Sequence, residues 1–243
     1  MLYTQWRVGG ERRNTEPAKA EQGSSMLEFS LVMAFMVPLF AATFSIGMTL
    51  SKGIQASNVC RDAVVLMVRS NTDPNSGLDL SLTQNQRIIV RAASGLHMNS
   101  DAQNDPDPNG MGVVILSKVV MVGPGECATG IVPAPGNAPP WNSGNCPNYG
   151  QYAFAYRVVI GNGSRWTSTL GNVPNGIVRG DGTVSPADIA SNTNNRAQHM
   201  GANGVVTLTP GKFALVSEMY VDIGYLNLFS IWNTPVIFAR SIS

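Results

Sequence analysis

The sequence predicts an α+β protein in which a long N-terminal transmembrane helical spine precedes an exported domain with an antiparallel β-sheet packed on helix. Two observations lead to this fold class. Residues 29–51 form a run of 23 residues without a charge, too long for an ordinary β-strand. Farther along the chain, segments rich in β-branched and aromatic residues alternate with turns rich in Asn, Gly and Pro, which is typical of antiparallel strands.

Composition narrows the class of protein. The chain has 243 residues, enough for one generous domain or one domain with extensions. Its net charge of +1 predicts no nucleic-acid partner, because nucleic-acid binding requires a clustered basic excess. Charged residues make up 13% of the chain, against roughly 25% in typical soluble domains. The uncharged run accounts for part of this deficit.

The uncharged run from Phe29 to Ser51 has the length of a membrane-spanning helix. At about 1.5 Å per residue it spans about 35 Å, slightly more than the ~30 Å hydrocarbon core of a bilayer. It has no polar stripe of the kind that a buried core helix shows. The alternative is a cleaved signal peptide, but its apolar core is only about 7–15 residues and its small residues follow the core. Here Gly23, Ser24 and Ser25 precede it.

Basic residues near the run predict its orientation. Four lie upstream, and Lys52 and Arg61 lie downstream; the upstream ones are Arg7, Arg12, Arg13 and Lys19. The excess of positive charge upstream favours a cytoplasmic N-terminus. We therefore expect a single-pass protein of the inner (cytoplasmic) membrane, with residues from about 53 onward in the periplasm or outside the cell.

Three cysteines are present, and two of them enclose the loop ECATGIVPAPGNAPPWNSGNC. This loop is poor in residues that pack, so a cross-link would give it order, and we expect a Cys127–Cys146 disulfide in an oxidising compartment. The alternative is two unrelated thiols. No CxxC spacing or nearby His supports a metal site. Cys60 is expected to be a small packing residue, with an intermolecular bridge or lipid attachment as alternatives.

The start of the apolar run carries a second pattern, in which Gly23 is followed five residues later by Glu28. This resembles the processing signal of type IV prepilins. The resemblance implies that a prepilin peptidase cuts after Gly23 and leaves Ser24 as the first residue. It also implies that Glu28 is an assembly contact, pairing with the freed α-amino group of a neighbouring subunit. Such a partner would offset the cost of a carboxylate in hydrocarbon. The simpler alternative is that Glu28 marks the membrane boundary.

The segment GSSMLEFSLVMAFMVPLF is similar to the start of TadE/TadG-like proteins, the pseudopilins of tight-adherence (Flp) pilus systems. The Leu-Glu-Phe core around Glu28 and the proline at Pro38 carry the match, which covers residues 20–70. The resemblance implies a minor pilin or pseudopilin, with incorporation in a surface pilus as one outcome. Its partners would be the prepilin peptidase, other pilins and the inner-membrane assembly platform. Two features depart from the family pattern: the longer exported domain, and Cys60 where alanine is usual.

The predicted organisation is a leader over residues 1–23, a helix over 24–70 containing the membrane segment, and an exported α+β domain over 71–243. Apolar spacing continues the first helix through residues 54–68, and a second helix is expected over 82–97. Residues 172–200 are rich in Asn and Gly and are expected to be a long surface excursion. The expected strands are residues 112–122, 151–160, 204–208, 213–223 and 235–242.

Two short strings in this excursion resemble binding motifs. Arg179-Gly180-Asp181 matches an adhesion tripeptide that often arises by chance. Residues 181–188 resemble the second half of a calcium loop, but Ile177 and Arg179 occupy the positions of the first two ligands. An ordinary EF-hand-like site is therefore excluded, and a weak, irregular site between Asp181 and Asp188 stays open.

Nothing in the sequence favours an enzyme. The chain has two histidines and none of the GxSxG, HExxH or P-loop patterns, so we expect no catalytic residues, metal or cofactor. The alternative to a pseudopilin is a single-pass envelope protein whose exported domain binds a ligand or another protein and never enters a filament.

Overall fold

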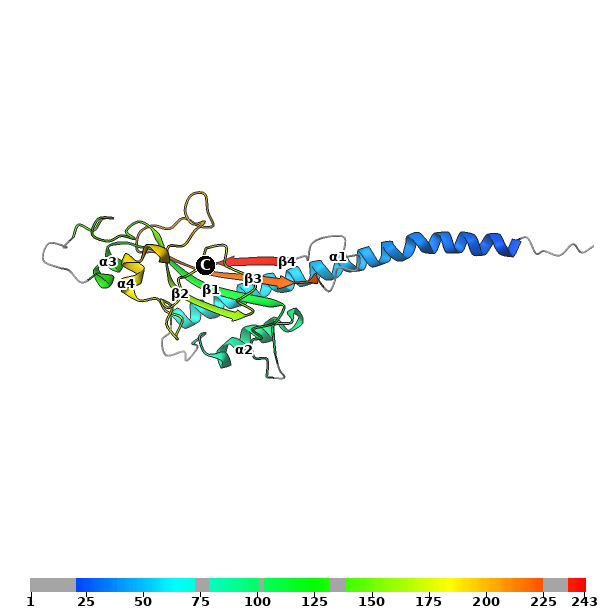
Figure 1. Ribbon diagram of the computed structural model, residues 1–243, viewed down its shortest axis with the longest axis horizontal. Helices are drawn as coiled ribbons and strands as arrows, with labels where there is room; N and C mark the ends of the chain where they lie inside the picture. The colour runs from blue at the N-terminus through cyan, green and yellow to red at the C-terminus, as the bar shows by residue number, and fades with distance from the viewer. Residues whose placement is uncertain (1–20, 73–78, 101–102, 132–138, 225–235) are drawn as a thin grey trace, which may run out of the picture. The chain divides into compact units, whose positions relative to one another are not determined.

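The computed structural model describes residues 21–72, 79–100, 103–131, 139–224 and 236–243, and its fold is α+β (Figure 1). The chain divides into two compact units, residues 1–44 and 45–243, and α1 contributes residues to both. The elements are α1 (Glu21–Thr72), α2 (Thr83–Ala92), η1 (Ser94–Leu96), β1 (Gly112–Met121), α3 (Pro124–Gly130), β2 (Tyr152–Gly161), α4 (Pro186–Ser191), η2 (Thr193–Asn195), β3 (Phe213–Asp222) and β4 (Val236–Ile242).

The four strands form one antiparallel sheet in the order β2-β1-β3-β4. β1 and β3 are central and almost wholly buried, as their β-branched sequences predict. The pairing of β1 with β2 shifts between Lys118 and Val119, so that Ala155 of β2 is passed over. At this bulge the Ala155 carbonyl instead accepts the Val184 N–H at 3.0 Å, which ties the later excursion to the edge of the sheet.

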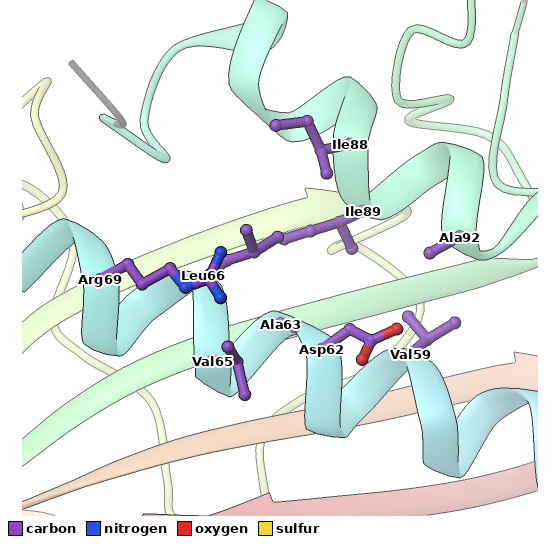
Figure 2. A pocket seen from close by; sticks show the side chains of 9 residues that line it. All are labelled: Val59, Asp62, Ala63, Val65, Leu66, Arg69, Ile88, Ile89 and Ala92. Atoms are coloured by element: carbon purple, nitrogen blue, oxygen red, sulfur yellow. The ribbon is translucent and has the colours of Figure 1, made fainter. Parts of the chain in front are cut away.

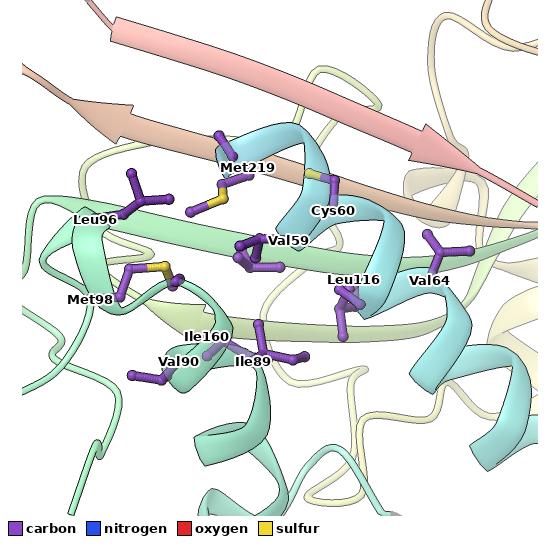
Figure 3. Packing of buried hydrophobic residues seen from close by; sticks show 14 of the residues in the cluster. Val59, Cys60, Val64, Ile89, Val90, Leu96, Met98, Leu116, Ile160 and Met219 are labelled. Carbon is purple, nitrogen blue, oxygen red and sulfur yellow. The ribbon is translucent and has the colours of Figure 1, made fainter. Parts of the chain in front are cut away.

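One face of the sheet packs on the C-terminal half of α1 and on α2. The buried positions of α1 follow the spacing of a single helix face; they are Ala56, Val59, Cys60, Ala63, Val64 and Met67. They contact sheet residues such as Leu116 and Met219, and Ile89 of α2 closes the cluster (Figure 3). The expectation of a sheet packed on a helical spine is thus confirmed.

Residues 162–212 supply apolar side chains to clusters on the opposite face of the sheet. Phe154, Val119 and Val216 are buried there, against Leu170 and smaller side chains from the excursion. The prediction of a long surface excursion over residues 172–200 is therefore wrong in part. That segment contains α4 and two fully buried residues, Ala190 and Asn195. The side chains that cover this face come from single apolar residues in the loops, which are too widely spaced in the sequence to show a helical or strand pattern.

Two further elements differ from the prediction. The strand expected over residues 204–208 is not formed, because Val205 and Leu208 pack on the sheet from a loop, with the Leu208 N–H donating to the Tyr152 hydroxyl at 3.2 Å. The second helix ends at Ala92 and continues only as η1, and His97 (φ 53°) then stops the helical path in the left-handed region.

Candidate functional site

The N-terminal half of α1 exposes apolar side chains all round. Phe35 is 72% exposed and Leu27 is 68% exposed, and none of the most apolar 18-residue window is buried. The exposed large apolar residues up to Leu50 are Met26, Leu27, Phe29, Leu31, Val32, Met33, Phe35, Met36, Val37, Leu39, Phe40, Phe44, Ile46 and Leu50. Soluble proteins rarely expose so much contiguous apolar surface. This helix is long and apolar enough to cross a membrane.

Three hydroxyl groups within this apolar half have hydrogen-bond partners inside the helix. The hydroxyls of Ser30, Thr43 and Thr49 donate to carbonyl oxygens three or four residues earlier, at 2.9–3.0 Å. Pro38 lies inside the helix and removes one backbone N–H. In lipid every polar group needs an internal partner, so these bonds suit a helix in hydrocarbon.

The residues of the predicted processing site all lie in the first two turns of α1. The helix begins at Glu21 and therefore includes Gly23 and Ser24, whose surroundings lie outside the described set. Glu28 is exposed, between the exposed Leu27 and Phe29. Five residues of helix separate Gly23 from Glu28 by about 7.5 Å along the axis. A peptidase that cuts after Gly23 would have to unwind the first turn.

The C-terminal half of α1 has one face buried and the other open beside α2. Between the two helices lies an apolar groove of ≈ 310 Å³, floored by Val59, Ala63 and Ile89. Figure 2 shows Val65 and Ile88 at this groove, with Asp62 and Arg69 on the same stretch of α1. Val65 is 47% exposed and Ile88 is 45% exposed, so apolar surface remains available here outside the membrane segment.

A disulfide joins Cys127 and Cys146, the pair that the loop composition predicts. Cys127 belongs to α3, and both sulfurs are buried in a small apolar cluster with Trp141 and Ala190. The cross-link closes a loop with a sequence separation of 19, which stabilises a fold by about 3 kcal/mol in the chain-entropy account.

Cys60 is buried in the main core under the sheet. Its thiol donates to the Ala239 carbonyl oxygen of β4 at 3.4 Å. Burial raises the pKa of this thiol to about 11, with a smaller raising effect from the Glu218 carboxylate and a lowering one from Ser217. The thiol is therefore protonated at neutral pH, and it packs as the sequence predicts.

A buried polar network on β3 was not foreseen from the sequence. Glu218 is 1% exposed, and its carboxylate accepts hydrogen bonds from Ser168, Thr169 and Arg240 of β4, the last at 2.7 Å. Arg157 on β2 is also buried, and desolvation lowers its pKa to about 10 although the Glu218 carboxylate acts in the opposite direction. The sequence signal that could have indicated this network is a single charged residue inside an otherwise apolar strand, as in YAFAYRVVI and ALVSEMYV.

The carboxylates of the calcium-like string have local structural roles. Asp181 accepts the Thr183 N–H and hydroxyl at 2.9 and 2.7 Å. Ser185 caps α4 by accepting the Asp188 N–H at 3.1 Å, and its hydroxyl donates to the Asp188 carboxylate at 2.5 Å. His199 Nδ1 lies 2.9 Å from the Thr169 carbonyl oxygen. Over the described ranges, no three His, Cys, Asp or Glu side chains are grouped so as to hold a metal ion.

Comparison with known proteins gives no match to this chain, whether with protein-family models, curated proteins or solved structures.

Proposed function

We propose that this protein is a minor pilin or pseudopilin of a tight-adherence (Flp-type) pilus or a related secretion machine. The observation that carries the proposal is the exposed, uninterrupted apolar surface of α1, which starts beside the Gly23 to Glu28 pattern. Such a surface requires lipid or neighbouring apolar helices around it. The proposed role is structural.

In this proposal the chain first enters the inner membrane through residues 29–51, with the N-terminus in the cytoplasm. The basic leader supports that orientation. The Cys127–Cys146 disulfide supports it independently, because disulfides persist in oxidising compartments outside the cytoplasm.

A prepilin peptidase then removes residues 1–23 and creates an α-amino group at Ser24. Glu28 of a neighbouring subunit pairs with this amine, or Glu28 of this subunit pairs with a neighbour's amine. Charge pairing supports assembly, since an uncompensated carboxylate in hydrocarbon costs roughly 2.5–3.5 kcal/mol on insertion scales. The partners are other pilins and the inner-membrane assembly platform.

The groove between α1 and α2 supports packing in the same assembly. Its floor is apolar and its rim carries both signs of charge, Asp62 and Arg69. A neighbouring pilin helix with exposed apolar residues would fill it and remove Val65 and Ile88 from water, at a gain of roughly 25 cal/mol per Å² buried.

The test is the mass of the N-terminus of protein isolated from membranes of cells that contain the prepilin peptidase. The proposal predicts a mature chain that begins at Ser24, and an uncut chain from the Gly23→Leu variant. The control is Gly47→Leu, in the same helix, where a Cβ meets nothing within 4 Å. An intact leader on the unaltered chain would contradict the proposal and favour a single-pass envelope protein that never enters a filament.

A further inference from the structure

The tripeptide Arg179-Gly180-Asp181 forms the tip of a tight hairpin. The Gly182 N–H donates to the Arg179 carbonyl at 2.9 Å, and the Arg179 N–H donates to the Thr183 carbonyl at 2.8 Å. Gly182 follows with φ 81°. This is a β-turn followed by a left-handed residue, a common three-residue hairpin. The tripeptide is therefore held in one backbone shape.

The base of this hairpin is fixed to the edge of the sheet. The Arg157 N–H of β2 donates to the Gly182 carbonyl at 2.7 Å, and Thr183 forms a bridge with Tyr156. Val184 is buried, and Gly182 packs so closely on Tyr156 and Val158 that a Cβ would lie 2.7 Å from a Val158 methyl group. The tip thus rests on a rigid support.

The two charged side chains of the tip face water. Arg179, Gly180 and Asp181 are all exposed. The hydrogen bonds from Thr183 to Asp181 Oδ1 lower the pKa of this carboxyl, with a smaller contribution from the Arg179 charge, so it is ionised at neutral pH. Both bonds from Thr183 use Oδ1. The tip presents a fixed carboxylate beside a guanidinium.

Among the described residues, no contact and no backbone angle requires position 180 to be glycine. Its φ is not positive, and a Cβ at this position would meet nothing within 4 Å. Gly182, two residues later, is required on both counts. The absence of a side chain between Arg179 and Asp181 instead suits the close approach of a second molecule.

We propose that Arg179, Gly180 and Asp181 form a docking site for a cell-surface receptor protein that holds a divalent cation beside an acidic pocket. The Asp181 carboxylate would complete the coordination of the cation, since Mg²⁺ and Ca²⁺ take oxygen ligands. The Arg179 guanidinium would bind acidic side chains in the pocket. Contact with a receptor on another cell requires the head, the residues from about 53 onward, to lie outside the cytoplasm, so the inference rests on the orientation given in the proposed function.

The experiment measures binding of the full-length protein in detergent micelles to an immobilised integrin ectodomain of the RGD-binding class, in buffer with Mg²⁺. We expect saturable binding that EDTA abolishes. Gly180→Ala and Asp181→Glu should each weaken binding by about 10-fold or more, equivalent to about 1.4 kcal/mol, at an unchanged melting temperature. Gly125→Ala is the matched control, because a Cβ there also meets nothing within 4 Å, and it should bind like the unaltered chain.

Absence of binding by the unaltered chain would overturn the inference, as would binding that survives EDTA or Gly180→Ala. The measurement is independent of the N-terminal processing test, because the purified chain binds with or without its leader. A failure of either proposal is therefore distinguishable from a failure of the other.

Discussion

The two halves of α1 differ in their charge and in their surroundings. Residues of the first half expose large side chains in every direction, whereas in the second half Ala56, Val59 and Met67 lie on one buried face. Charges separate the halves, since the first charged residue after Glu28 is Lys52, whose ammonium group donates to the Gly95 carbonyl of η1. One helix therefore has an exposed apolar half and a half that packs in the core. In the sequence, the uncharged stretch marks the first half and the charged residues from Lys52 onward mark the second.

The largest difference between the halves should appear on truncating a methionine in each. Met67 is 2% exposed and Met36 is 47% exposed. Met67→Ala removes core contacts and should lower the free energy of unfolding of the head by about 2–5 kcal/mol. Met36→Ala should change it by less than about 0.5 kcal/mol. Denaturant titration in micelles, followed by near-UV circular dichroism, measures both. Equal losses would show that the first half also belongs to the head's core.

Removing the disulfide should destabilise only the unit that contains the sheet. Replacing Cys127 and Cys146 together by serine should cost the head about 3 kcal/mol. The helical signal of the first half should persist in micelles, because α1 does not contain these cysteines. The measurement follows, in the same samples, the unfolding of the head and the helical signal that remains afterwards. Simultaneous loss of both signals would mean that the halves unfold as one unit.

Thiol labelling can distinguish a cysteine that is protected by the protein core, such as Cys60, from one that is protected by lipid in the first half of α1. The pKa of the Cys60 thiol is about 11, so at pH 8 its thiolate fraction, and its reaction with a water-soluble maleimide, should be at least about 100-fold below those of an ordinary cysteine. Because burial raises this pKa, the rate should rise with pH toward 11.

The matched variant is Ala42→Cys in a Cys60→Ala background. Ala42 is exposed in the structure, so a cysteine there should be protected in membranes and react once detergent dissolves them. Cys60 should stay slow until the head unfolds. Rapid labelling of position 42 in intact membranes would contradict the membrane assignment.

A smaller effect is expected at the groove of the second half. Val65→Ser should change the head's stability by less than about 0.5 kcal/mol, because the side chain is 47% exposed. On the proposed function it should reduce co-purification with pilins, because it removes apolar surface from the groove. Unchanged co-purification would exclude the groove as a packing surface.

The sequence predicts this protein best where a pattern repeats. The apolar run is recognisable by its length, and the helix from Ala56 to Met67 and the strands around Leu116 and Met219 by patterns that extend over many residues; the structure has all of them. The cover over the second face of the sheet was missed because its pieces, such as Leu170 and Val205, are isolated apolar residues between glycines and asparagines.

The candidate site divides in the same way. The disulfide pair followed from local composition. The network around Glu218 joins Arg240, 22 residues away, to Thr169, 49 residues away, and such partners are set by strand order and loop path. Sequence shows only that a charge stands in an apolar strand. The tripeptide match likewise does not show that Gly180 lies at the exposed tip of a hydrogen-bonded hairpin, which only the backbone geometry reveals.

The most direct test of the central claim is the entry of Glu28 variants into filaments sheared from cells that express the whole assembly machine. The account predicts that Glu28→Ala is processed to Ser24 and stays in the membrane, absent from the filaments, whereas Glu28→Asp retains part of the incorporation of the unaltered chain. Incorporation of Glu28→Ala at the level of the unaltered chain would contradict the assembly role of this carboxylate.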